Sequence, residues 1–205
     1  HVIDLTTGKN AYLETLRKRK SFYQDTQRCR RKLSSEIGAV KFGYDSTPPL
    51  DAVQNVLDRK QAQYRASGAV AVFDRFERRA WIAALNEVHS PYCALSVATL
   101  KAGDRDCAWH FGLICQGVMH YWFPVYEKSL GKYSPGRMLV LDLVEAAADL
   151  GIMTIDLGAG DAPWKRNLAN VTQKIGKVFW RRPSVLSLPA QVLVGLEWRL
   201  GQSRE

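Results

Sequence analysis

The sequence predicts an α/β protein whose mixed sheet contains an antiparallel meander and is covered by helices on both faces. Helical spacing of apolar residues dominates the chain before residue 90, and three apolar runs with short Gly-containing links follow it. After residue 133 the pattern changes to a helix, a short strand and a second helix start. A crossover helix between parallel strands places ligands beyond the carboxyl ends of those strands. We therefore expect the functional site in this last part.

The part of the chain before residue 90 is predicted to be mainly helical. Apolar residues recur there at spacings of three and four, as on the buried face of a helix. The aromatic residues Phe73, Phe76 and Trp81 share such a spacing and are expected in the core. The predicted elements are a strand at 2–5, a helix at 10–33, a strand at 40–44 and helices at 50–65 and 73–88.

The three apolar runs predict an antiparallel meander with strands at 92–101, 107–115 and 118–126. Both faces of these runs are apolar, which requires helices on both sides of the sheet. A two-residue turn before Val118 would set His110 opposite Phe123 and His120 opposite Leu113. Side chains alternate along a strand, so the two histidines are expected on opposite faces and not as a metal pair.

The segment from Tyr133 predicts a helix with a clear start and end. Ser134 suits the N-cap, Pro135 the first helical position and Gly151 the C′ position. The acidic residues of this helix lie three and four apart, which predicts one narrow solvated stripe. They are Asp142, Glu145 and Asp149.

The first turn of this helix is a candidate phosphate site. Amides in a first helical turn lack intrahelical acceptors and lie at the positive end of the helix dipole. The amides expected there belong to Gly136, Arg137 and Met138, and Gly136 has no side chain to block a ligand. A strand at 152–157 and a short helix at 164–171 follow.

At 205 residues the chain is long enough for one domain with appendages. We expect a basic helix in 1–36 that packs on the domain or leads into it, a catalytic domain in 37–184, and an amphipathic tail in 185–205. A last strand is expected at 177–181, near the end of the catalytic domain, and a helix at 188–200 in the tail. The formal charge of +9 favours polyanionic ligands without identifying one.

The four cysteines show no CxxC or Cys/His ligand spacing. This predicts reduced cysteines in a cytoplasmic protein, with neither a disulfide framework nor a bound metal. No apolar run reaches the length of a membrane span, so no transmembrane segment is expected. The basic runs Arg17–Lys20 and Arg28–Lys32 are either a solvated helix face or a surface that binds nucleic acid.

Four motifs together resemble a known family. They are His110–Leu113, His120–Pro124, Tyr133–Gly136 and the segment from Asp156 to Lys165. In this order they resemble the CelD/BcsL group of GNAT acetyltransferases, which is associated with cellulose and exopolysaccharide synthesis, and the resemblance covers roughly 33–171. More distantly, the chain is similar to Fem-type transferases, which use aminoacyl-tRNA.

The resemblance implies the GNAT fold, acetyl-CoA as the co-substrate and direct transfer of an acetyl group to a sugar or polysaccharide-precursor acceptor. The donor would be bound at the helix start, by Ser134, Gly136, Arg137 and Met138. An upstream domain or the exopolysaccharide synthesis machinery are the partners that it implies. No activated Cys or Ser nucleophile stands out, which favours a ternary complex over a covalent intermediate.

His110 is the predicted general base, because imidazole titrates in the appropriate range. Asp156 is expected to orient the acceptor or to hold Lys165, and Tyr121, Trp164 and Lys165 are the predicted acceptor-binding residues. Many GNAT enzymes carry a Tyr near position 164 that protonates the leaving thiolate, which Trp cannot do. Two alternatives therefore stay open, a transferase that uses aminoacyl-tRNA and a catalytically inactive GNAT interaction module.

Overall fold

A computed structural model describes residues 1–18, 20–70, 72–88, 90 and 92–176. The chain divides into two compact units, His1–Gln173 and Lys174–Glu205. The predicted strand at 177–181, the tail helix at 188–200 and the domain boundary at 184 lie outside the described residues.

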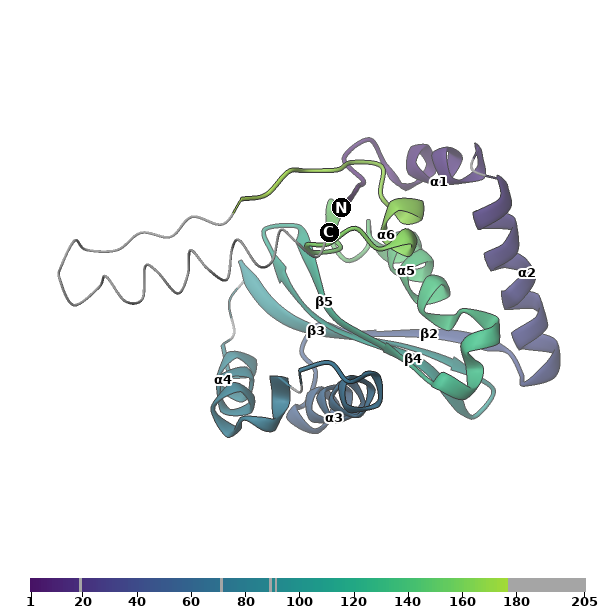
Figure 1. The fold of residues 1–205 in the computed structure, drawn as a ribbon. Coiled ribbons are helices and arrows are strands. Elements are labelled where there is room, and N and C mark those ends of the chain that lie inside the picture. The colour runs from purple at the N-terminus through teal and green to yellow at the C-terminus, as the bar shows by residue number, and fades with distance from the viewer. Residues whose placement is uncertain (19, 71, 89, 91, 177–205) are drawn as a thin grey trace, which may run out of the picture. The chain divides into compact units, whose positions relative to one another are not determined.

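The first unit contains helices on both sides of one sheet (Figure 1). Its elements are, in chain order, β1 (Val2–Asp4), α1 (Lys9–Lys18), α2 (Lys20–Glu36), β2 (Val40–Asp45), α3 (Leu50–Ser67), the 3₁₀ helix η1 (Val72–Asp74), α4 (Phe76–Asn86), β3 (Cys93–Ala102), β4 (Arg105–Cys115), β5 (Val118–Tyr126), the 3₁₀ helix η2 (Lys128–Tyr133), α5 (Pro135–Ala146), β6 (Thr154–Asp156) and α6 (Pro163–Leu168).

The sheet has six strands in the order β1-β6-β5-β4-β3-β2. The strands β3, β4 and β5 form the predicted antiparallel meander, and α5 crosses over so that β6 lies parallel to β5. The N-terminal strand β1 completes the sheet by pairing antiparallel with β6. The predicted α/β class and mixed sheet are confirmed.

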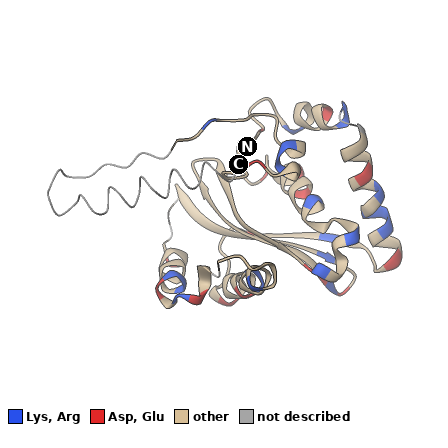
Figure 2. Ribbon diagram, viewed as in Figure 1, with Lys and Arg blue, Asp and Glu red and all other residues tan. Residues whose placement is uncertain are grey.

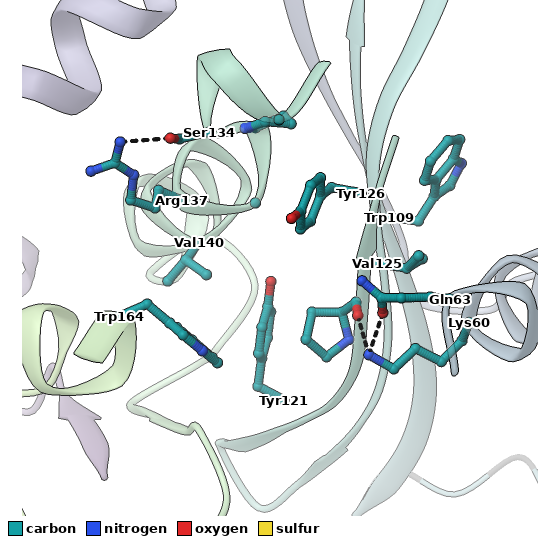
Figure 3. Close-up of a pocket in the computed structure, with 14 residues that line it drawn as sticks. Lys60, Gln63, Trp109, Tyr121, Val125, Tyr126, Ser134, Arg137, Val140 and Trp164 are labelled. Atoms are coloured by element: carbon teal, nitrogen blue, oxygen red, sulfur yellow. Dashed lines mark hydrogen bonds between the residues drawn. The ribbon is translucent and has the colours of Figure 1, made fainter. Parts of the chain in front are cut away.

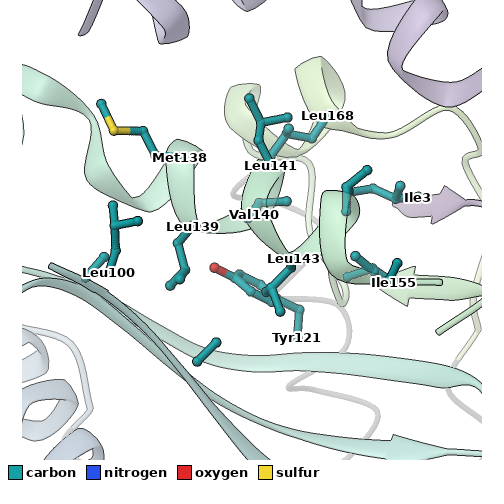
Figure 4. Close-up of a cluster of buried hydrophobic side chains, with 14 of the residues drawn as sticks. Ile3, Leu100, Tyr121, Met138, Leu139, Val140, Leu141, Leu143, Ile155 and Leu168 are labelled. Carbon is teal, nitrogen blue, oxygen red and sulfur yellow. The ribbon is translucent and has the colours of Figure 1, made fainter. Parts of the chain in front are cut away.

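Two apolar clusters hold the helices against the sheet. The first joins one face of the sheet to α5, α1 and α2, and Figure 4 shows Leu139, Leu143 and Ile155 within it. The second lies under α3 and contains Val53, Leu57 and Phe111 among its buried residues. The meander is thus apolar on both faces and covered on both, as its sequence predicts.

The predicted helix at 10–33 is two helices, α1 and α2. The second packs against α5, and the Arg30 guanidinium donates hydrogen bonds to both carboxylate oxygens of Asp142, the shortest at 2.5 Å. The prediction of a solvated acidic stripe on α5 is therefore wrong at Asp142, because α2 covers that residue.

The predicted helix at 73–88 is divided into η1 and α4. Phe73 is buried and its ring meets that of Phe123 edge-on, with centroids 4.9 Å apart. Phe76 and Trp81 are 80% and 58% exposed, so their predicted place in the core is wrong. Ile82 is the buried residue of α4, because the helix turns the face with Ile82 inwards and the face with Phe76 and Trp81 outwards.

A β-bulge alters the predicted register of the meander. Leu113 lies opposite His120 as predicted, but His110 lies opposite Pro124 and not Phe123. The register shifts between Phe111 and Leu113, where β5 contains one residue more than β4. An extra residue changes the face of every side chain beyond it, which a simple count from the turn does not foresee.

The cysteines of neighbouring strands lie closer than their spacing suggests. Cys93 and Cys115 are directly opposite each other on β3 and β4, and their sulfur atoms are 2.6 Å apart as free thiols. Cys29 and Cys107 are buried separately. Among the described residues, no helix is long and apolar enough to cross a membrane.

Candidate active site

A cavity of about 380 Å³ begins where β5 and β6 separate. The two strands pair through Val118–His120 and Thr154–Asp156, and the pairing ends there. Figure 3 shows the cavity between the free edge of β5, the start of α5, and side chains from α3 and α6. Its aromatic and polar lining residues include Lys60, Gln63, Trp109, Tyr121, Tyr126, Ser134, Gly136, Arg137 and Trp164.

The start of α5 faces this cavity through Gly136. The amide of Gly136 has no acceptor among the described residues, whereas that of Arg137 donates to the Ser134 carbonyl at 3.1 Å. A Cβ atom added at Gly136 would have Tyr126 Cδ1 as its nearest neighbour, at 3.9 Å. One amide at the positive end of the helix is therefore open to a ligand.

Ser134 occupies the N-cap position but its side chain does not cap the helix. Its backbone is left-handed, with φ 56°, and its hydroxyl accepts a hydrogen bond from Arg137 Nη2 at 2.6 Å. The capping bond that the sequence predicted is therefore absent, because a left-handed N-cap residue does not aim its side chain at the first amides.

Arg137 and Met138 are turned towards α2. The Arg137 guanidinium lies 2.8 Å from Asp25 and over the ring of Phe22. Met138 is buried, and Figure 4 shows its side chain directed away from the sheet. Of the four residues predicted to bind the donor, Ser134, Gly136 and Arg137 line the cavity, and Met138 is part of the core.

His110 lies behind the cavity wall. Its side chain is fully buried and its ring stacks on that of Tyr121, with centroids 4.0 Å apart and planes inclined by 10°. Neither ring nitrogen has a hydrogen-bond partner among the described residues, and burial lowers the pKa of His110 to about 3. Such a group is a weak base without access to an acceptor, so the environment does not suit the predicted role.

Gly112 provides the space that the His110 ring occupies. A Cβ atom at Gly112 would lie 2.5 Å from His110 Cε1 and 2.5 Å from the His120 carbonyl oxygen. The bulge in β5 is opposite the same glycine. Gly112 therefore permits both the bulge and the stacking of His110 on Tyr121.

Asp156 pairs with His120 at the point where the strands separate. His120 Nδ1 lies 3.6 Å from Asp156 Oδ2, and Asp156 Oδ1 accepts a hydrogen bond from the Gly158 amide at 2.8 Å. Both side chains are partly exposed, and the His120 ring lies near that of Trp122. The sequence interpretation preferred His110 to His120, but the histidine that the fold joins to Asp156 is His120.

Lys165 and Trp164 have different positions. The Lys165 ammonium donates to the carbonyl oxygens of Gly158 and Ala159, at 3.3 and 2.6 Å, and burial lowers its pKa. It thus fixes the loop after β6 and does not form the predicted direct bond to Asp156. Trp164 lines the cavity, with its ring centroid 6.4 Å from that of Tyr121.

The sequence interpretation missed two polar residues that α3 contributes. Lys60 Nζ donates to the Pro124 carbonyl at 2.6 Å and to Gln63 Oε1 at 2.9 Å, and both side chains line the cavity. Burial lowers the pKa of Lys60 to about 8. In the sequence, Lys60 and Gln63 form a polar i,i+3 pair next to the apolar stripe of α3. Such pairs are common on solvated helices, so this pair does not by itself indicate a site.

The fold and the cavity together define an α/β protein with a candidate ligand site at the start of α5. The chain belongs to the Acetyltransferase (GNAT) domain family, whose model matches residues 20–166. It is accordingly a GNAT-type acetyltransferase, and GNAT domains use acetyl-CoA. No curated protein matches the chain.

Solved structures share this fold at low sequence identity. One is an aminoglycoside acetyltransferase, meta-AAC0020 from an uncultured soil metagenomic sample, in complex with sisomicin. It is 7% identical, with a TM-score of 0.50, and the match covers 71% of this chain and 97% of that chain. The same protein in complex with trehalose is 6% identical, with a TM-score of 0.49, over 70% and 97% of the two chains.

The residues of the cavity fit acetyl-CoA. The open Gly136 amide suits a phosphate oxygen, and Val140 and Trp164 provide an apolar wall for the uncharged part of the donor. Among the described residues, no group of three or more His, Cys, Asp or Glu is arranged to hold a metal ion.

Proposed function

We propose that this protein transfers the acetyl group of acetyl-CoA to an amine or hydroxyl of a sugar-derived acceptor, by direct transfer in a ternary complex. The assignment to the CelD/BcsL group is part of this proposal and depends on the motif resemblance. The observation that carries the proposal is the Gly136 amide, which has no acceptor among the described residues and lies at the cavity along the unpaired part of β5.

On the donor side, the start of α5 would hold the diphosphate. Backbone amides and the helix dipole favour phosphate there without a dedicated cationic side chain. Arg137 lines the same end of the cavity, but its guanidinium is engaged by Asp25, so we give it a supporting role. Below this end, the free edge of β5 and the Trp164 ring would enclose the pantetheine.

On the acceptor side, we assign the general base to His120 and its orientation to Asp156. A carboxylate beside an imidazole fixes the orientation of the ring, as in other His-carboxylate pairs. The pair stands at the last residues before the strands separate, next to the gap that the acetyl group would reach. His110 then has a supporting role behind Tyr121. Asp156 would orient His120, whereas the sequence analysis expected it to orient the acceptor or to hold Lys165.

The proposal of a sugar-derived acceptor has three sources of support. Trp122 lies beside His120 and offers an aromatic surface to the apolar face of a sugar ring. The motif resemblance points to polysaccharide precursors. The complex of meta-AAC0020 with sisomicin shows an aminoglycoside bound to a protein of this fold, and that likeness extends to the fold alone.

The basic surface of α2 favours the acetyl-CoA proposal over the alternative that uses aminoacyl-tRNA. Figure 2 shows acidic and basic residues interspersed on this helix. Three of its cations pair with carboxylates: Arg28 with Asp25, Arg30 with Asp142, and Lys32 with Glu36. Cations neutralised in this way contribute less to the binding of a polyanion.

Isothermal titration calorimetry with acetyl-CoA tests the donor site. We expect the wild type to bind, and Gly136→Ala to bind at least tenfold more weakly, because its methyl group would cover the amide while leaving room for the fold. Gly176→Ala is the matched control, since among the described residues no atom beyond the adjacent residues lies within 4 Å of its added Cβ. No heat of binding in the wild type, or equal affinity in the two variants, would remove the donor assignment.

Release of free thiol from acetyl-CoA in the presence of amino sugars tests the acceptor class. We expect release to depend on an added amino sugar or polysaccharide fragment, and mass spectrometry to show an acceptor that is one acetyl group heavier. Release only with simple alkylamines or peptides would reject a sugar-derived acceptor while leaving the acetyltransferase activity intact.

A further inference from the structure

We propose that the Tyr121 hydroxyl donates a hydrogen bond to the carbonyl oxygen of the bound acetyl thioester and stabilises the negative charge that develops there. This inference rests on the proposed function, because it requires acetyl-CoA in the cavity. It assigns Tyr121 a catalytic role in place of the acceptor-binding role predicted from the sequence.

The first evidence is a buried hydroxyl without a partner. Tyr121 is 4% exposed, and its hydroxyl has no hydrogen-bond partner among the described residues. Burying a hydroxyl without a partner is unfavourable and uncommon, which suggests that a ligand provides the partner. Figure 3 shows this hydroxyl within the cavity wall, directed along the cavity towards Tyr126.

The second evidence is that the Tyr121 ring is fixed. His110 stacks on one side at 4.0 Å, Trp164 stands at the cavity wall, and Gly112 admits the His110 ring. A donor held in place before the reaction stabilises developing charge without reorganising, which is the main advantage of an oxyanion hole. His110 is thus a positioning residue for Tyr121.

The third evidence is the location of Tyr121 in the cavity. It directly follows His120, the last residue of β5 that pairs with β6. Tyr126, the neighbour of Gly136, is five positions further along the strand, which corresponds to roughly 16 Å. A donor whose phosphates lie at Gly136 would therefore bring its acyl end towards Tyr121 and His120. These two residues would approach the same gap from opposite faces of the sheet.

Burial keeps Tyr121 a donor and not an acid. It raises the pKa of the phenol well above its ordinary value, so the hydroxyl keeps its proton throughout the pH range in which proteins are stable. Tyr121 would therefore stabilise the oxyanion by hydrogen bonding, without transferring its proton.

Acetyl transfer then needs no general acid at position 164. The acceptor nitrogen or oxygen forms a bond to the acetyl carbon while His120 takes its proton, and the carbonyl electrons move to the oxygen that Tyr121 stabilises. As the carbonyl re-forms, the C–S bond breaks and the sulfur leaves with the electron pair. The pKa of a thiol such as that of Cys is about 8.5, which makes the thiolate a good leaving group. The sulfur can therefore leave without a proton from residue 164.

Isotope-edited infrared spectroscopy of bound acetyl-CoA, labelled with carbon-13 at the carbonyl, tests the inference. We expect a lower carbonyl stretching frequency on the wild type than in solution, and a return towards the solution value on Tyr121→Phe. Calorimetry should show nearly equal affinity of both proteins for CoA, and kcat should fall about 100- to 1,000-fold in the variant. Tyr64→Phe, outside the cavity, is the matched control and should behave as the wild type.

The outcomes separate this inference from the proposed function. Wild type that binds acetyl-CoA without any change in carbonyl frequency would overturn the inference and leave the donor site standing. An equal change in the wild type and in Tyr121→Phe would also overturn it. Wild type that does not bind acetyl-CoA would overturn both. The wild-type spectrum alone provides a test if Tyr121→Phe fails to fold.

Discussion

His120 Nδ1 and Asp156 Oδ2 lie 3.6 Å apart on the neighbouring parallel strands β5 and β6. The two residues are directly opposite each other and form the last pair before the strands separate. Asp156 also fixes the loop after β6 through the Gly158 amide. A histidine beside a carboxylate therefore stands at the end of the β5–β6 pairing, one residue before Tyr121, which lines the cavity.

The first prediction concerns this pair. We expect His120→Gln to lower kcat about 100- to 10,000-fold, the usual contribution of a general base, with little change in acetyl-CoA affinity. Asp156→Asn should cost less, because the amide oxygen can still accept from Gly158. Steady-state thiol release and calorimetry measure the two effects. Full activity of His120→Gln would show that His120 is not the general base.

The second prediction concerns His110 and acid stability. Its pKa is about 3 in the folded protein and ordinarily 6.5, so the unfolded state binds more protons between these values. Stability is therefore lost as the pH falls through that window. We expect His110→Phe, which keeps a stacked ring, to reduce the loss between pH 7 and pH 5 by about 2 kcal/mol. Urea unfolding at both pH values measures this difference, and parallel losses in the two proteins would contradict it.

The third prediction concerns Gly112. Its added Cβ would lie 2.5 Å from the His110 ring and the His120 carbonyl oxygen. We expect Gly112→Ala to lower the free energy of unfolding by about 1–3 kcal/mol, as overpacking does elsewhere. Gly176→Ala, with open space around it, should be close to neutral. Chemical denaturation compares the two, and equal stability would show that the His110 ring can move aside.

The fourth prediction concerns Lys60 and alkaline pH. Its pKa is about 8 in the folded protein and ordinarily 10.5, so the unfolded state again binds more protons in this window. Stability should therefore increase as the pH rises from 8 to 10. Relative to Lys60→Met, we expect the wild type to gain about 1–2 kcal/mol, allowing for its partial exposure. A constant difference between the two proteins across this range would contradict the lowered pKa.

Much of the fold could be predicted because its signals are local. The apolar runs and Gly-containing turns predict the meander, and Pro135 with the apolar run after it predicts the crossover helix. The pairing of β1 with β6 was not predicted. It joins distant parts of the chain, which periodicity does not encode.

The site was predicted in part. Gly136, Tyr121 and Trp164 line one cavity, as the motifs suggest. His110 was predicted to be the general base, but its side chain is buried and stacked on Tyr121, and the β5 bulge beside that stack leaves no clear mark in the sequence. Lys60 reaches the cavity from α3, more than sixty residues before Pro124, and only the packing of α3 on β5 brings the two together.

The most direct test of the central claim follows the Gly136 amide by nuclear magnetic resonance. We predict that CoA and acetyl-CoA shift this resonance and slow its hydrogen exchange, whereas acetyl-pantetheine, which lacks the phosphates, leaves it nearly unchanged. An amide that responds to none of these compounds, or equally to acetyl-pantetheine, would contradict a phosphate site at the start of α5.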